Sequence, residues 1–89
     1  MTETQDRVND ETLRELGERV RAHRDALGIS QERLARRAGL HWTFVGQVER
    51  GQRNPSTSNL LKIAYGLEMD AGALVSGLPV PPIDYERPW

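Results

Sequence analysis

The sequence contains no cysteine, which excludes disulfide bonds and thiolate metal sites. This absence suits a reducing compartment, and we expect a cytoplasmic protein. The sequence also lacks any apolar run close to the roughly 20 residues that a membrane-spanning helix needs. Its first residues are polar and acidic, unlike a secretory signal peptide. The 89 residues are therefore expected to form one small domain that makes no use of a membrane.

Groups of residues that would carry catalysis are also absent. His23 and His41 stand alone without the spacing of metal ligands, and the carboxylates are dispersed along the chain. The glycines at positions 28, 39, 51 and 77 fall at predicted helix ends, and none of them belongs to a phosphate-binding loop. We therefore expect no enzymatic activity, no metal and no cofactor.

The net charge of −1 is small, but charge is unevenly distributed along the chain. Residues 17–53 hold eight arginines against four carboxylates, a net charge of +4. Residues 1–16 carry −3 and residues 54–89 carry −2. A basic centre between acidic ends is a candidate footprint for nucleic acid. Charge alone is equally typical of a solvated helical surface.

Capping residues and glycines divide the chain into five short helices, which predicts an all-α fold. Asp10, Ser30, Ser56 and Asp70 are suitable N-caps, whereas His41 is a poor one. Glycines then favour helix ends. The predicted helices span about 11–27, 31–38, 42–50, 57–67 and 71–76. We expect a disordered segment over 1–9, a helical domain over 10–78 and a non-helical, proline-rich tail over 79–89.

Apolar residues at helical spacing predict one buried side for each helix. Leu27 is expected on this side of the first helix, together with Gly17. The other expected core residues are Leu13, Leu16, Val20, Leu34, Ala35, Ala38, Val45, Val48, Leu60, Ile63, Ala64, Leu67 and Leu74.

The second and third helices have the length and separation of a DNA-binding helix-turn-helix. Gly39 provides a small residue at the corner, and Ala35 provides one where the helices touch. Spacing alone is equally compatible with an ordinary helical hairpin. If the motif is present, the outer face of its third helix carries Trp42, Thr43, Gly46, Gln47 and Arg50.

The sequence from about residue 16 to 78 resembles the Xre/Cro-type helix-turn-helix domain of phage repressors, and restriction–modification controller proteins in particular. The resemblance implies five helices and transcriptional regulation through an operator, usually as a homodimer. It is carried by Ser30-Gln31, Leu34-Ala35, Ala38-Gly39, Glu49-Arg50-Gly51, the loop from Arg53 to Ser56, and the helix from Leu60 to Ala64.

The resemblance places Trp42, Thr43 and Gln47 at positions that contact base edges in the major groove. Gln47 has the chemistry to bind adenine N6 and N7 together. Trp42 departs from the polar residue usual at its position, and it either contacts DNA or packs on Phe44. Gly46 also departs from the family pattern: without a side chain it contacts no base, and it allows DNA to approach closely.

Backbone contacts and one structural pair also follow from the resemblance. Gln31 resembles a residue that lies beside the DNA backbone and can reach a base, and the helix N-terminus there favours a phosphate. Arg24 and Glu49 match a pair that links the first helix to the third. The phosphate-binding candidates at the end of the third helix are Arg50, Arg53 and Asn54, with Arg36 and Arg37 as weaker ones.

We therefore expect a sequence-specific regulator that binds a near-palindromic site in double-stranded DNA as a homodimer. Leu61 and Tyr65 lie away from the core side of their helix, and they could form a dimer patch with Leu78, Val80, Tyr85 and Trp89. The alternative function is a protein-interaction module, such as an antitoxin whose proline-rich tail binds a protein partner.

Overall fold

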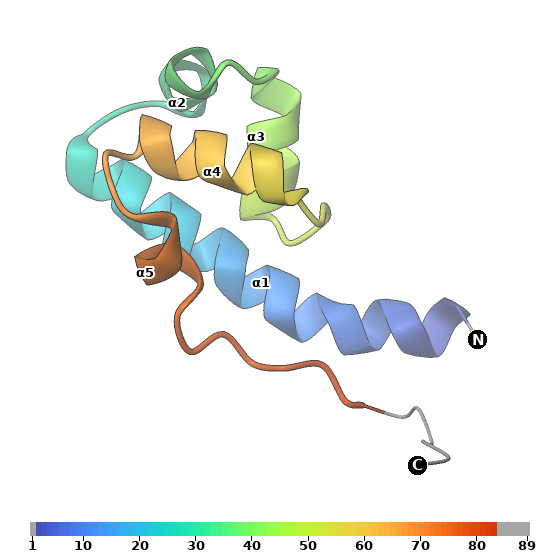
Figure 1. Cartoon of the computed structure of the whole chain (residues 1–89). Coiled ribbons are helices and arrows are strands. Elements are labelled where there is room, and N and C mark those ends of the chain that lie inside the picture. The colour runs from blue at the N-terminus through green and yellow to red at the C-terminus, as the bar shows by residue number, and fades with distance from the viewer. Residues whose placement is uncertain (1, 84–89) are drawn as a thin grey trace.

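The computed structural model describes residues 2–83, and the side chains of residues 11–83. It contains five helices and no strand within these residues, which confirms the predicted all-α fold (Figure 1). None of the described helices is both long and apolar enough to cross a membrane. The helices are α1 (Thr2–Leu27), α2 (Gln31–Ala38), α3 (Trp42–Glu49), α4 (Thr57–Gly66) and α5 (Ala71–Val75).

The first helix differs from the expectation at its start. α1 begins at Thr2, whereas we expected a disordered segment over 1–9 and an N-cap at Asp10. The polar, non-periodic composition of this segment had suggested disorder. However, residues 2–16 contain neither glycine nor proline, and acidic residues near a helix N-terminus interact favourably with its dipole. The helix therefore continues beyond the part that packs on the core.

The core lies between α1 and the helices that cover it. Its fully buried side chains include Val20 of α1, Leu34 of α2, Val45 of α3, Ile63 of α4 and Leu74 of α5. Every helix therefore contributes to one core. The prediction for Leu27 was wrong, since its side chain is exposed in the last turn of α1. The partly buried Leu40, Phe44, Leu60, Met69 and Leu78 pack around this core.

Two glycines allow the helices to approach each other closely. A Cβ atom added to Gly17 of α1 would lie 2.4 Å from the Val48 carbonyl oxygen and 2.5 Å from that of Glu49. A Cβ atom added to Gly66 of α4 would lie 2.8 Å from Leu34 Cδ1 in α2. Gly17 thus permits backbone contact between α1 and α3, and Gly66 sets the position of α2 on α4.

Local capping fixes the ends of α2 and α3. The Ser30 hydroxyl accepts a hydrogen bond from the Arg33 amide, as predicted for an N-cap. Gly39 ends α2 with a φ of 69°, a left-handed conformation that favours glycine. His41 caps α3 through its ring, whose Nδ1 accepts a hydrogen bond of 3.2 Å from the Thr43 amide. His41, which we expected to be a poor cap, therefore serves as the N-cap of α3.

The segment after α5 is attached to α1. The Thr12 hydroxyl donates a 2.7 Å hydrogen bond to the Pro79 carbonyl. The Arg19 guanidinium donates to the carbonyls of Leu74 and Ser76 at the end of α5. The tail consequently runs along the side of α1 that lies away from α4 (Figure 1). Tyr85 and Trp89, which we had placed in a dimer patch, lie outside the described residues.

Candidate nucleic-acid interface

The outer face of α3 exposes polar and aromatic side chains while its inner face is buried. Val45 and Val48 are fully enclosed in the core. On the other side, Trp42 keeps 50% of its surface exposed, Thr43 is exposed and Gln47 is half-buried. The turn from Gly39 to His41 holds this face beside the start of α2. The structure thus brings together the three side chains that we expected to contact bases.

Trp42 and Thr43 are both held by His41. The indole of Trp42 stacks on the imidazole with ring centroids 6.0 Å apart and an interplanar angle of 24°. The Thr43 hydroxyl lies within hydrogen-bond distance of His41 Nδ1. Of the two expectations for Trp42, packing against Phe44 is replaced by stacking on His41, which leaves half of the indole available to a ligand.

Gly46 lies in a different environment from the one we expected. It is buried, although we had placed it on the open face of α3. A Cβ atom added there would lie 3.2 Å from Arg50 Nη1 and 3.5 Å from Gln31 Oε1. Two polar side chains therefore cover the glycine, and the expected direct approach of DNA to its backbone must be corrected.

An ion pair joins α1 to the end of α3. The Arg24 guanidinium donates from Nε to Glu49 Oε2 at 2.6 Å and from Nη2 to Glu49 Oε1 at 3.0 Å. Its Nη1 atom donates to the Ile29 carbonyl at 2.9 Å. Hydrogen bonding to Glu49 raises the pKa of Arg24, against the lowering effect of burial. Arg24 therefore stays charged until pH rises through this raised pKa, and the pair orients α3 throughout the neutral range.

Gln31 extends this ion pair to α2. Its Nε2 atom donates a 2.9 Å hydrogen bond to Glu49 Oε1, the oxygen that also accepts from Arg24. The Glu49 side chain is 3% exposed and so depends on these donors for the hydrogen bonds lost from water. We had assigned Gln31 a place beside the DNA backbone, from which it can also reach a base. Its structural bond to Glu49 was missed because the two residues are distant in sequence.

Cationic side chains surround the end of α3. Arg53 lies over the Phe44 ring, with its guanidinium carbon 5.3 Å from the ring centroid. Arg50 is exposed and donates from Nε to Gln52 Oε1 at 3.2 Å. Asn54 is exposed in the loop that follows. All three phosphate-binding candidates are thus on the surface around α3, with Arg50 at its end and the Arg53 guanidinium beside Phe44 in its first half.

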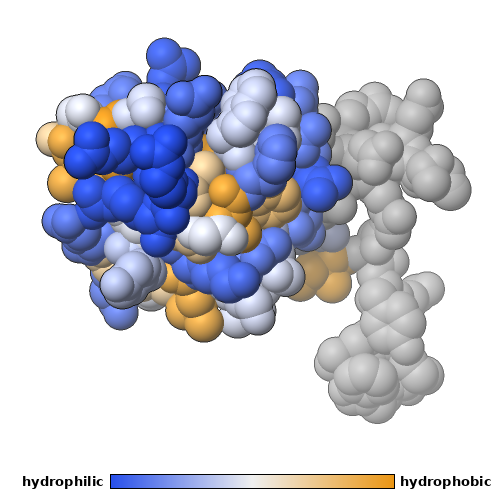
Figure 2. All heavy atoms as spheres, turned by 90° about the horizontal axis from the view of Figure 1, so that it is seen from above, coloured by the Kyte–Doolittle hydropathy of each residue, from blue (hydrophilic) through white to orange (hydrophobic). Residues whose placement is uncertain are grey.

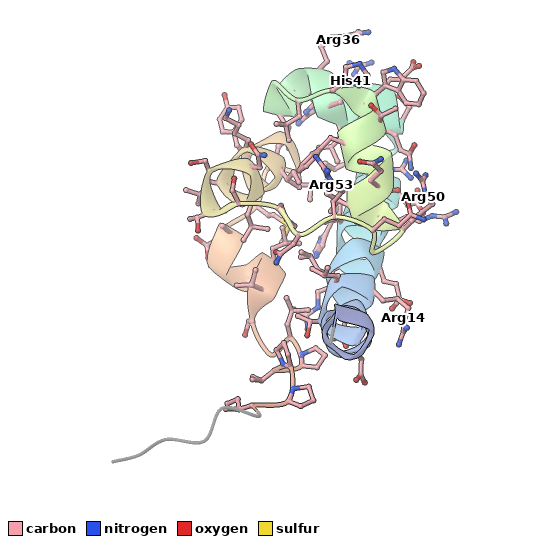
Figure 3. All side chains as sticks on the ribbon, turned by 90° about the vertical axis from the view of Figure 1, so that its right-hand side faces the viewer. Arg14, Arg36, His41, Arg50 and Arg53 are labelled. Atoms are coloured by element: carbon pink, nitrogen blue, oxygen red, sulfur yellow. The ribbon has the colours of Figure 1, made fainter. Side chains whose placement is uncertain are left out.

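Figure 3 places two further arginines relative to this helix. Arg36 and His41 lie at the end where α3 starts, and Arg14 of α1 lies beyond the other end, on the same side as Arg50 (Figure 3). A Cβ atom added to Gly51 would lie 3.0 Å from Arg14 Cα, so the turn after α3 touches α1 there. Arg14 is not among the residues expected from the sequence, because it lies outside the motif. By contrast, Arg37 forms a salt bridge with Glu68.

The molecule seen from the side of α2 is largely hydrophilic, and its apolar residues form separate small areas (Figure 2). The described residues contain no group of three histidine or carboxylate side chains able to hold a metal ion. The surface of α2 and α3 thus offers mainly hydrogen-bonding and cationic groups.

The residues expected in a dimer patch differ in their exposure to solvent. Leu61 and Tyr65 are exposed one turn apart on α4, with 55% and 78% of their surfaces accessible. Leu78 is partly buried against the core, and Val80 is exposed on the tail. The tail segment that carries Val80 runs along the side of α1 that lies away from α4 (Figure 1).

Comparison with known proteins identifies a helix-turn-helix domain in this chain. The helix-turn-helix (HTH_3) family model matches residues 20–70. Control protein C.SmaI of Serratia marcescens is 41% identical over 61 residues, which cover 68% of this chain and 73% of that protein. The crystal structure of the restriction-modification controller protein C.AhdI from Aeromonas hydrophila has a TM-score of 0.68 and 48% identity. The match covers 70% of this chain and 94% of that one.

A second solved structure is the P22 c2 repressor in complex with synthetic operator 9T. It has a TM-score of 0.65 and 34% identity, and the match covers 70% of this chain and 94% of the repressor chain. The expected resemblance to controller proteins and phage repressors is thereby confirmed. The chain belongs to the helix-turn-helix family of DNA-binding transcriptional regulators.

Proposed function

We propose that the outer face of α3 enters the major groove of an operator and reads its sequence. The observation that carries this proposal is the outer face of α3, where Trp42 and Thr43 are exposed and Gln47 is half-buried. This face lies between cationic side chains at both ends of the helix (Figure 3). A helix fits the major groove of B-DNA, where each base pair presents a distinct set of donors and acceptors. Cations at the two helix ends would meet the phosphates that border the groove.

Individual roles follow from the chemistry of the side chains. The Gln47 amide can donate and accept at once, which suits adenine N6 and N7. Thr43 presents a methyl group that suits a thymine methyl. The exposed half of the Trp42 indole offers apolar surface to a thymine methyl or a sugar. These three residues would specify sequence.

The cationic residues would provide binding without specificity. Arg50 and Arg53 would neutralise phosphates, and Asn54 would hydrogen bond to one. We add Arg14, because the turn after α3 places it on the same side as Arg50 (Figure 3). Each contact of this kind releases counterions, so affinity should fall steeply as salt concentration rises.

We further propose that two copies of the chain bind together. Leu61 and Tyr65 on the exposed side of α4 are the candidate contact, since apolar side chains of this size favour burial. A two-fold dimer would place two α3 helices about 34 Å apart, facing successive major grooves. The operator would then be near-palindromic. A genomic DNA target would also place the protein in the cytoplasm.

A second candidate function rests on the tail. Val80 and Ile83 are exposed on a segment that Thr12 attaches to α1. Such apolar side chains on an extended, proline-rich segment suit a protein partner, as in an antitoxin. This function is compatible with DNA binding, because the tail runs along α1 and away from α3.

The experiment that tests the proposed function is selection of fragments of the source genome by the purified full chain. We expect a recovered sequence shared between fragments, with two related half-sites. Deletion of residues 79–89 should leave this selection unchanged while abolishing copurification of any tail-bound protein. Recovery of fragments without a common sequence would contradict sequence-specific regulation.

A further inference from the structure

Gly46 lies at the centre of α3, yet it is buried by polar side chains rather than by the core. The atoms nearest to the position of its missing Cβ are Arg50 Nη1 at 3.2 Å and Gln31 Oε1 at 3.5 Å. These side chains come from different helices and meet over the same residue. The space above a glycine is therefore occupied by two polar groups.

The position of Gln31 is defined from two sides. Its Nε2 atom donates to Glu49 Oε1 at 2.9 Å, and Glu49 is itself fixed by Arg24. A side-chain amide has two N–H donors, so one remains after the bond to Glu49. With its oxygen held over Gly46, Gln31 keeps that second donor for an acceptor outside the protein.

Arg50 is positioned along the same surface. Its Nη1 atom lies over Gly46, and its Nε atom donates to Gln52 Oε1 at 3.2 Å. The guanidinium thus lies back along α3, while the Arg50 side chain stays exposed to solvent. Gln31 and Arg50 together present N–H donors beside one glycine, and phosphate oxygens are acceptors that suit such donors.

We propose that Gly46 is a positioning residue of the DNA interface: its missing side chain lets Gln31 and Arg50 lie together over α3 and bind the DNA backbone as a unit. This inference rests on the proposed function, because it assigns a role within that interface. It predicts that Gly46 affects DNA affinity through its two neighbours and without touching DNA.

The size of the side chain at position 46 should determine how much operator affinity is lost. In Gly46→Ala the new Cβ lies 3.2 Å from Arg50 Nη1, so the arginine must move by only a few tenths of an ångström. We expect at most about a threefold loss of operator affinity and no loss of thermal stability, since alanine favours helix more than glycine does. Gly46→Leu fills the space and should reduce operator affinity by about tenfold or more, because both donors are displaced.

A double-mutant cycle separates this indirect effect from a collision between leucine and DNA. Operator affinity is measured at low salt for the full chain with and without Gly46→Leu, in the wild-type and in the Gln31→Ala, Arg50→Ala background. We expect the leucine to cost less than about threefold in that background, because the side chains it displaces are already absent. The matched control Ala73→Leu places the same leucine side chain on α5, which does not form the interface, and should leave affinity unchanged.

A measurement on the free protein provides a second test. The side-chain amide resonances of Gln31, assigned by their absence in Gln31→Ala, should shift in Gly46→Leu and remain in place in Ala73→Leu. Two results would overturn the role of Gly46. One is that Gly46→Leu reduces operator affinity as much in the Gln31→Ala, Arg50→Ala background as in the wild type. The other is that the Gln31 resonances do not shift. Either result leaves the proposed function intact, whereas failure of the wild-type protein to prefer any genomic fragment would overturn that function itself.

Discussion

Arg24 and Glu49 are joined by two hydrogen bonds across 25 residues of sequence, from Nε to Oε2 at 2.6 Å and from Nη2 to Oε1 at 3.0 Å. Both side chains are largely shielded from water, at 12% and 3% exposed. The bond connects α1 to the last residue of α3, and Gln31 connects the same carboxylate to α2. One carboxylate thus fixes the position of α3 relative to two other helices.

Removal of one partner should destabilise the fold strongly. In Arg24→Ala the Glu49 carboxylate stays buried without its main donor. We expect the free energy of unfolding to fall by about 3–5 kcal/mol, as for other buried ion pairs that lose one partner. Denaturant unfolding followed by circular dichroism measures this change.

The matched control for this prediction is Arg21→Ala, because Arg21 pairs with Asp25 at 3.8 Å with both side chains mostly exposed. Exposed pairs contribute about 0.5 kcal/mol or less. Equal stabilities of the two variants would contradict a structural role for the Arg24–Glu49 pair.

The close contact between α1 and α3 predicts a second sensitive position. Gly17→Ala introduces a Cβ atom 2.4 Å from the Val48 carbonyl oxygen, where backbone atoms must move. We expect a loss of about 2 kcal/mol or more in unfolding free energy, and weaker DNA binding because α3 shifts. Thermal unfolding and operator titration measure the two effects.

Gly28→Ala serves as a comparison, since Gly28 has a φ of 70° but open space around its Cβ position. Gly28→Ala should lower the free energy of unfolding by about 1–2 kcal/mol through backbone strain alone. Operator affinity of the folded protein should be unchanged. If Gly17→Ala bound the operator like wild type, the contact with α1 would not set the position of α3.

Much of the fold follows from local sequence signals. Ser30, Gly39 and Ser56 determine helix ends by short-range bonds and backbone conformation, so the limits of α2 and the start of α4 could be predicted. The start of α1 could not, because a polar segment without glycine or proline is compatible with either helix or coil. Thr2 rather than residue 11 begins the helix.

The candidate site was predictable where a residue acts within its own helix. Gln47 is on the outer face of α3 because helical periodicity places it there. The environment of Gly46 depends instead on Gln31, which reaches it from α2, and no periodicity within α3 reveals that contact. The placement of Arg14 likewise depends on how α1 crosses the turn after α3.

Base contacts and phosphate contacts should respond differently to mutation. We expect Gln47→Ala to reduce discrimination at one base pair of each half-site by about 1–3 kcal/mol, with little change on random DNA. Arg53→Ala and Arg14→Ala should each weaken binding to all sequences and lower the slope of log affinity against log salt by about 1. Titrations of operator and random DNA at several salt concentrations test both.

Lys62→Ala is the control for net charge, because it removes one exposed cation from α4 rather than from the surface around α3. Its salt slope should match the wild-type slope. If Lys62→Ala lowered the slope as much as Arg14→Ala, the effect of Arg14 would be general electrostatics rather than a phosphate contact.

The exposed Leu61 and Tyr65 predict that dimer formation depends on this face of α4. Substitution of both Leu61 and Tyr65 by serine should convert a dimer into a monomer at micromolar concentration, while the fold remains intact. Sedimentation velocity and circular dichroism measure assembly and fold. A matched substitution of Val80 by serine on the tail should leave the dimer unchanged. A wild-type protein that sediments as a monomer throughout this range would rule out the proposed dimer.

The central claim is that α3 reads base edges in the major groove, and a combined change in protein and DNA tests it most directly. Replacement of individual half-site adenines by 7-deazaadenine removes the N7 acceptor without altering base pairing. We expect one such replacement to weaken wild-type binding by about tenfold, and to have no further effect on Gln47→Ala. Equal losses for both proteins at every adenine would contradict base recognition by Gln47 of α3.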